Sequence, residues 1–270
     1  MPAYPTTLTR THRAMRAGWS RWLIIAFGLA LLASSVASAQ ELGTIRFDNW
    51  LYFQENPNNT GQWQYRPRFY IPVNLPMGWT FTQRIDLPIL DTDRVGPDNP
   101  TGKWKAGIGD WFIEEGFTTP QVAKNLKLYG SVRFVFPTGG QAPFSASQYQ
   151  WAPAVSAIYT IPEDHLTVSP LVRYYRGYSA TETNVSLVRR LDVFPTVNFG
   201  LADNWSLAFY NGEFPMSYNY VNNKWFVPID AMLIKRLSKT VELGIGGAYG
   251  IVTDNPTYKY QVYGRLSYYF

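Results

Sequence analysis

The chain ends in the stretch Tyr258-Lys-Tyr-Gln-Val-Tyr-Gly-Arg-Leu-Ser-Tyr-Tyr-Phe270, in which two kinds of residue alternate. One parity holds Tyr260, Val262, Gly264, Leu266, Tyr268 and Phe270, and the other holds Lys259, Gln261, Tyr263, Arg265 and Ser267. Successive side chains of a β-strand point to opposite faces. A period of two therefore predicts a strand with an apolar face and a largely polar face.

The place of this strand at the end of the chain favours a closed barrel in a membrane. The last strand of such a barrel pairs with the first and leaves no free edge. We interpret Tyr268 and Phe270 as an assembly signal, which the barrel-assembly machinery would read. The alternative is the last strand of a soluble sandwich or a lipocalin-like barrel.

The beginning of the chain has the three parts of a secretory signal. Arginines 10, 13, 16 and 21 are followed by the apolar run 22–33 and by the small residues Ala37-Ser-Ala39. This order predicts a signal peptide over residues 1–39, handled by the secretion translocon and cleaved after Ala39. A membrane-anchoring helix fits less well because the apolar run is short. Residues 40–270 then form a single domain.

Charge and composition exclude several classes of function. The four arginines before residue 40 are among the 24 basic residues, and none of the 19 acidic ones precedes it, so the exported part has 20 basic and 19 acidic residues. This near balance does not indicate a nucleic-acid partner. The chain has no cysteine, so we expect no disulfide and no metal site with Cys ligands. We also expect no cofactor.

Alternating segments separated by turn residues repeat along the whole exported part. Residues 62–73 are the clearest example, with Trp63, Tyr65 and Phe69 on one parity and Arg66 and Arg68 on the other. About twelve such segments predict an all-β, antiparallel up-and-down transmembrane barrel in the outer membrane of a Gram-negative bacterium, with the lipid bilayer as partner. Tryptophans stand at strand starts, where interfacial girdles belong, at Trp63, Trp79, Trp104, Trp205 and Trp225.

Some boundaries are harder to place. The alternation predicts one strand over residues 184–199 and another over 205–213, followed by a loop over 215–223. Prolines inside expected strands remove ladder hydrogen bonds, so we expect bulges near them. These prolines are Pro67, Pro153, Pro170, Pro195 and Pro228.

The parity opposite the apolar face collects the charges, and we expect it to line the lumen. The candidate solute path is Arg46, Asp48, Arg66, Arg68, Tyr70, Arg84, Asp86, Tyr129, Arg133, Arg173, Tyr175, Arg190, Asp230, Tyr263 and Arg265. Two interpretations stay open: a pore with a weak preference for anions, or an interior plugged by Arg–carboxylate pairs.

Four of these arginines, residues 46, 66, 68 and 84, fall on three consecutive expected strands. Only Asp48 and Asp86 are close enough in register to neutralise them. A dry interior would make that surplus costly, so we expect this quadrant to face water.

Catalysis is not indicated. An enzymatic barrel needs a base beside a nucleophile, and the exported part has a single histidine, His165, in the expected turn Pro162-Glu-Asp-His165. One histidine and no cysteine also disfavour a transition-metal site.

Two motifs carry a resemblance to a known family. Gly107-Ile-Gly-Asp110 and Leu128-Tyr-Gly-Ser-Val-Arg-Phe-Val-Phe-Pro-Thr-Gly-Gly140 resemble the outer-membrane protein family named for the meta-pathway of phenol degradation. The motifs cover about a third of the exported part. The resemblance implies a barrel that moves small, often aromatic or hydrophobic compounds, and it implies no particular binding residues.

Together these observations predict an outer-membrane channel for passive uptake or efflux of small solutes, with aromatic or weakly anionic compounds as candidates. The alternative is a closed structural barrel, or one that meets a partner through its external loops, without transport.

Overall fold

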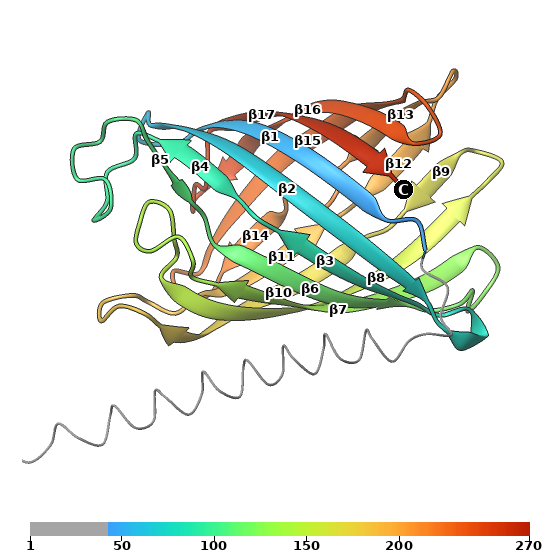
Figure 1. Cartoon of the computed structure of the whole chain (residues 1–270), viewed down its shortest axis with the longest axis horizontal. Helices are drawn as coiled ribbons and strands as arrows, with labels where there is room; N and C mark the ends of the chain where they lie inside the picture. The colour runs from blue at the N-terminus through green and yellow to red at the C-terminus, as the bar shows by residue number, and fades with distance from the viewer. Residues whose placement is uncertain (1–42) are drawn as a thin grey trace, which may run out of the picture. The chain divides into compact units, whose positions relative to one another are not determined.

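The computed structural model describes residues 43–270, which form a closed antiparallel barrel of 12 strands (Figure 1). The predicted fold class is therefore confirmed. The signal peptide predicted over residues 1–39 lies outside the described residues.

Seven strands are continuous: β1 (Arg46–Glu55), β2 (Gly61–Asn74), β7 (Leu126–Phe136), β8 (Gln148–Ile161), β15 (Lys224–Arg236), β16 (Val241–Thr253) and β17 (Tyr260–Tyr269). The other five are each interrupted once: β3 (Thr80–Asp86) continues as β4 (Ile89–Thr92), β5 (Lys105–Ile108) as β6 (Trp111–Thr118), β9 (Leu166–Val168) as β10 (Leu171–Ala180), β11 (Arg189–Phe194) as β12 (Val197–Gly200), and β13 (Trp205–Phe209) as β14 (Met216–Asn219).

The first and last strands close the barrel. β1 pairs antiparallel with β17 along its whole length, from Arg46 opposite Tyr269 to Glu55 opposite Tyr260, and with β2 on its other side. The ladder continues past β17, because Phe270 donates its backbone N–H to the carbonyl of Ile45 at 2.9 Å. Every wall strand thus has two neighbours, as transmembrane barrels require.

Two of the prolines in expected strands lie at strand interruptions, and a third lies at a register shift. Pro170 lies between β9 and β10, Pro195 lies between β11 and β12, and a register shift accompanies Pro228 in β15. The expected irregularities are confirmed at these three positions. Pro67 and Pro153 instead stay within the continuous strands β2 and β8.

One predicted strand begins too early. Residues 184–188, expected to start a strand, lie in the loop before β11. The reason is local: the Gln148 side chain accepts the backbone N–H of Val188 at 2.8 Å and donates to the carbonyl of Ser186 at 3.3 Å. These bonds replace the ladder bonds that a strand would need.

The two ends of the barrel differ (Figure 1). The C-terminus lies at the end with short connections, including a 3-10 turn (Pro76–Gly78) and the turns 162–165 and 237–240. The opposite end carries the loops 93–104, 137–147 and 181–188. Within residues 43–270, no helix is long and apolar enough to cross a bilayer.

The two motifs quoted above meet in space at the loop end. Thr138 Oγ1 accepts the N–H of Trp111 at 3.0 Å and donates to the carbonyl of Gly109 at 2.9 Å. Asp110 accepts the backbone N–H groups of Gly139 at 3.3 Å and Ala146 at 2.8 Å. The Gly-x-Gly-Asp strand and the Pro-Thr-Gly loop are therefore hydrogen-bonded to each other at the rim of the barrel.

The outer face is apolar and the inner face polar, the reverse of a soluble protein. Large apolar side chains remain exposed along the wall, among them Leu51, Phe117, Val155, Ile229, Ile245 and Val262. Trp63, Trp104 and Trp225 are exposed near the loop end, and Trp79 and Trp205 near the turn end. Aromatic side chains at both rims and apolar ones between them fit a lipid bilayer.

The interruption between β13 and β14 differs from the others because it adds residues. From Val193 to Val197 the neighbouring strand advances four residues, while its partner advances seven, from Phe209 to Met216. Three extra residues therefore leave the wall. We call residues 210–215 the inward segment. The predicted loop over 215–223 is wrong in part, because the chain re-enters the wall as β14 after the inward segment.

Candidate functional site: the barrel interior

The inward segment places Glu213 among three arginines. Arg68 Nη1 lies 2.5 Å from Glu213 Oε1, Arg66 Nη1 lies 3.1 Å from Oε2, and Arg84 Nη2 lies 3.8 Å from Oε1. The hydroxyl of Tyr52 also donates to Oε2 at 3.0 Å. Four strands, β1, β17, β16 and β15, separate β2 from β13 and β14 along the wall. These contacts therefore cross the interior.

Asp86, which lies on the barrel wall, also binds Arg68 and Arg84. Its carboxylate accepts from Arg68 Nε at 2.8 Å and from Arg84 Nε and Nη2 at 2.8 and 2.9 Å. Arg68 pairs with Asp86 across β2 and β3, so their meeting follows from register alone. Two carboxylates from opposite sides of the barrel thus share one group of guanidiniums.

A second cluster surrounds Glu114 on β6. Arg133 donates to Oε2 through Nε at 3.0 Å and Nη2 at 2.7 Å, while Arg173 Nη2 lies 2.6 Å from Oε1. Ser131 and Tyr129 donate their hydroxyls to the same Oε1 at 2.8 and 3.2 Å. Arg84 Nη1 lies 3.9 Å from Glu114, so Arg84 joins both clusters.

A third pair lies on β11. Arg190 donates to Asp192 through Nε at 2.8 Å and Nη2 at 3.0 Å, and Ser217 donates to the same carboxylate at 2.8 Å. The guanidinium of Arg190 lies 4.4 Å from the ring centre of Tyr175, whose hydroxyl accepts from Arg133 at 2.8 Å. The connected network holds six arginines (66, 68, 84, 133, 173 and 190) and four carboxylates (86, 114, 192 and 213), so positive charge is in excess.

The expectation that the four-arginine quadrant faces water is wrong for Arg68, which is only 1% exposed. The physical reason is Glu213, which neutralises Arg68 from across the barrel. The residues of neighbouring strands could not predict this contact. Arg66 keeps 23% of its side chain exposed. Arg46 is separate from the group: it lies 3.2 Å from Asp48, and its guanidinium lies 3.9 Å from the ring centre of Tyr70.

Aromatic side chains fill the other side of the interior. The buried cluster includes Trp50, Tyr52, Phe214, Phe226, Tyr258 and Tyr263. Phe214, the residue after Glu213, lies 4.8 Å from Tyr263 and 5.9 Å from Tyr52 between ring centres. Tyr263 also hydrogen-bonds Asp230. The inward segment therefore contributes one residue to the charged network and the next to the aromatic cluster.

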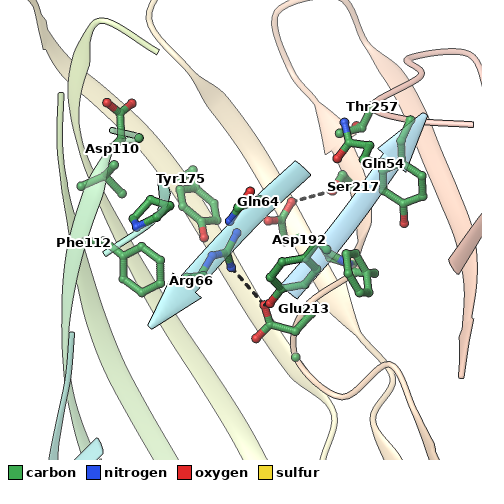
Figure 2. A pocket seen from close by; sticks show the side chains of 18 of the residues that line it. Gln54, Gln64, Arg66, Asp110, Phe112, Tyr175, Asp192, Glu213, Ser217 and Thr257 are labelled. Carbon is green, nitrogen blue, oxygen red and sulfur yellow. Dashed lines mark hydrogen bonds and ion pairs between the residues drawn. The ribbon is translucent and has the colours of Figure 1, made fainter. Parts of the chain in front are cut away.

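Two cavities lie on either side of this layer of side chains. A cavity of about 390 Å³ opens toward the loop end, where Gln62 is among its lining residues. Figure 2 shows Gln54, Asp110 and Thr257 in the same lining. A smaller one of about 120 Å³ lies toward the turn end, beside Thr82, Tyr129 and Leu171. Both are lined by Arg84 and Gly212. The side chains around Arg84 and the inward segment therefore lie between the two cavities and narrow the interior. We call this level of the barrel the constriction.

The remaining candidate residues lie elsewhere. Arg265 of β17 forms an ion pair with Glu242 of β16. Tyr268 pairs with Phe47 and Val241 in the closing strands, and the Phe270 side chain is 77% exposed. His165 lies in an exposed turn, where its carbonyl accepts the N–H of Gly200.

Sequence reasoning missed the residues that close the interior, namely Glu213 and the aromatic pair Trp50 and Tyr52. Glu213 was expected at the end of a strand. The three extra residues reverse the parity of the alternation between Phe209 and Met216, but the loop expected over 215–223 concealed that shift. Gly212 was a local signal in the sequence, because glycine readily adopts the left-handed conformation found there, at φ 91°.

Comparison with solved structures supports the architecture. An outer-membrane channel from Pseudomonas putida F1 matches with a TM-score of 0.64 and 11% identity, over 86% of this chain and 95% of its own. The fold is that of an outer-membrane β-barrel. The NanC porin matches with a TM-score of 0.52 and 12% identity, over 84% of this chain and 99% of its own. The KdgM porin, solved with disordered oligogalacturonate, matches with a TM-score of 0.50 and 9% identity, over 83% and 99%.

No family model matches the chain, and no curated protein matches it in sequence. The resemblance to the meta-pathway family therefore rests on the two motifs alone.

Proposed function

We propose that this protein is an outer-membrane channel for small solutes, whose path runs through the barrel interior and is narrowest at the constriction. One observation carries the proposal: the two cavities share Arg84 and Gly212 as lining residues, so both reach the same layer of side chains. A solid core would leave no such chambers at both ends.

The structural neighbours support the same function, since all three are described as channels or porins. The excess of arginine over carboxylate in the network favours anionic solutes. Aromatic solutes, which the family resemblance implies, would meet the rings of Phe112 and Tyr175 in the larger cavity. We assign no catalytic role to the interior.

The alternative, a closed structural barrel, also has an observation in its favour. Arg68 and Asp86 are at most 1% exposed and form part of a continuous ion-pair network. Buried networks of this kind fill the interiors of small barrels. Conductance separates the two functions.

Recordings in planar bilayers test the proposal. The wild-type barrel should give discrete current steps. Glu213→Gln removes the central negative charge while keeping the side-chain shape, so the ratio of anion to cation permeability should rise about twofold or more.

Glu163→Gln, in the exposed turn 162–165, is the matched control and should leave the permeability ratio unchanged. If the folded wild type and Glu213→Gln are both silent, the interior is closed and the channel proposal is wrong.

A further inference from the structure

The larger cavity contains two amide side chains without partners. Gln62 and Gln150 line it and are 8% and 7% exposed, and neither side chain takes part in a hydrogen bond within residues 43–270. Neither amide is among the polar groups that are both unpaired and shielded from solvent, so the polar atoms of both face the open cavity. A solute that offers donors and acceptors there can therefore complete their hydrogen bonds.

The two amides stand on different parts of the wall. Gln62 belongs to β2 and Gln150 to β8, with three strands of the wall between them: β3–β4, β5–β6 and β7. Gln62 continues a row of amides, because it pairs with Gln54 on β1, which in turn pairs with Gln261 on β17. Each amide offers both a donor and an acceptor, which matches hydroxyl groups.

A cationic group lies in the same cavity. Arg190 uses Nε and Nη2 on Asp192, and its side chain remains 39% exposed. Its Nη1 takes no part in the pair with Asp192 and is available to a carboxylate. The planar guanidinium stacks on Tyr175, which fixes its orientation.

We propose that this cavity is a binding site for a sugar acid, a compact solute with several hydroxyls and one carboxylate. Its volume of about 390 Å³ falls within the range of small-molecule sites, roughly 300–1,000 Å³. The hydroxyls would pair with Gln62 and Gln150, and the carboxylate with Arg190. An apolar aromatic acid would leave both amides unpaired, so it should bind less well.

The inference deepens the proposed channel by naming a solute class, and binding can be measured without transport. The test uses the purified barrel in detergent and titration calorimetry with glucuronate, glucose and benzoate. Glucuronate has hydroxyls and a carboxylate, whereas glucose lacks the charge and benzoate lacks the hydroxyls. We expect glucuronate to bind at least tenfold more tightly than either.

Variants assign the contacts. Replacing Gln62 and Gln150 together by leucine should weaken glucuronate binding about tenfold and leave benzoate binding unchanged. Arg190→Gln should abolish the preference for glucuronate over glucose. Gln121→Leu, exposed in the turn at the other end of the barrel, is the matched control and should bind as the wild type does.

Two results would overturn the site: benzoate binding as tightly as glucuronate, or the folded double variant binding glucuronate like the wild type. Heat-modifiable migration on gels checks folding. If the double variant fails that check, the single variants replace it, and a loss below twofold in both also overturns the site. Glucuronate binding by a barrel that is silent in bilayers would refute the channel alone, whereas conductance without binding would refute the sugar-acid site alone.

Discussion

At Glu213, three arginine side chains approach a single carboxylate at 2.5 to 3.8 Å. They differ in exposure: Arg68 is 1% exposed and held by two carboxylates, whereas Arg66 borders the larger cavity and is 23% exposed. Removing one partner of a buried ion pair leaves an uncompensated charge in a medium that solvates it poorly. Arg66 and Arg68 lie two positions apart on the same strand face. We therefore expect them to have different roles, Arg68 in stability and Arg66 in ion permeation.

Arg68→Gln should destabilise the barrel, because Asp86 and Glu213 lose the most deeply buried of the arginines that they share. We expect a loss of about 3–5 kcal/mol in the free energy of unfolding, measured by denaturant titration in lipid vesicles.

Arg66→Gln should change stability by less than about 1 kcal/mol, since its pair is partly solvated. It should instead lower the ratio of anion to cation permeability in a salt gradient. Equal stability losses in the two variants would show that both arginines belong to a rigid polar core.

At the scale of elements, the inward segment narrows a barrel whose wall would otherwise run straight. The wall on both sides keeps its pairing, with Val193 opposite Met216 and Val197 opposite Phe209. The inserted residues are held by their side chains as well: the hydroxyl of Tyr210 donates to the carbonyl of Pro228 at 2.7 Å. The element thus sets the diameter of the path independently of the strand number.

Deleting residues 212–214 should restore equal strand lengths on both sides of the interruption. We expect the barrel to fold and its single-channel conductance to rise severalfold, because the interior loses both Glu213 and Phe214 and fills with water.

The control keeps the length and replaces Glu213 and Phe214 by alanine, so the backbone remains inside and the gain should be smaller. A folded deletion variant with wild-type conductance would place the narrowest point elsewhere.

At the scale of the whole molecule, we expect the last residue to matter more for assembly than for the stability of the folded state. The backbone of Phe270 continues the ladder to Ile45, but its side chain is 77% exposed. Its loss therefore removes little packing. An exposed aromatic residue at the turn end is available to the assembly machinery or to the membrane interface.

Replacing Phe270 by Asp should reduce the amount of heat-modifiable barrel in the outer membrane several-fold, while the protein that does assemble keeps its unfolding midpoint in detergent. Phe270→Tyr, which keeps the aromatic ring, should restore the amount. Wild-type levels of the Asp variant would mean that the terminal side chain is not part of the signal.

The alternation of residues determined the fold class, because each strand of a membrane barrel must turn an apolar face to lipid and a polar face inward. Register determined more: once β2 and β3 pair, Arg68 must lie opposite Asp86, and the closing pair β1–β17 follows from the last thirteen residues. The face of each side chain and the pairing of adjacent strands depend only on residues close in the chain or on neighbouring strands. An alternation with a period of two is therefore enough to predict them.

Only the tertiary structure decided what occupies the interior. Glu213 meets Arg68 across the barrel, 145 residues away in the chain, and Phe214 enters an aromatic cluster built from β1, β15 and β17. Such contacts depend on the curvature of the wall and on three residues that leave it. The curvature does not appear in the alternation, and the three residues only reverse its parity, which does not show that Glu213 and Phe214 enter the interior. The constriction, the two cavities and the unpaired amides of Gln62 and Gln150 exist because the closed wall brings distant strands face to face.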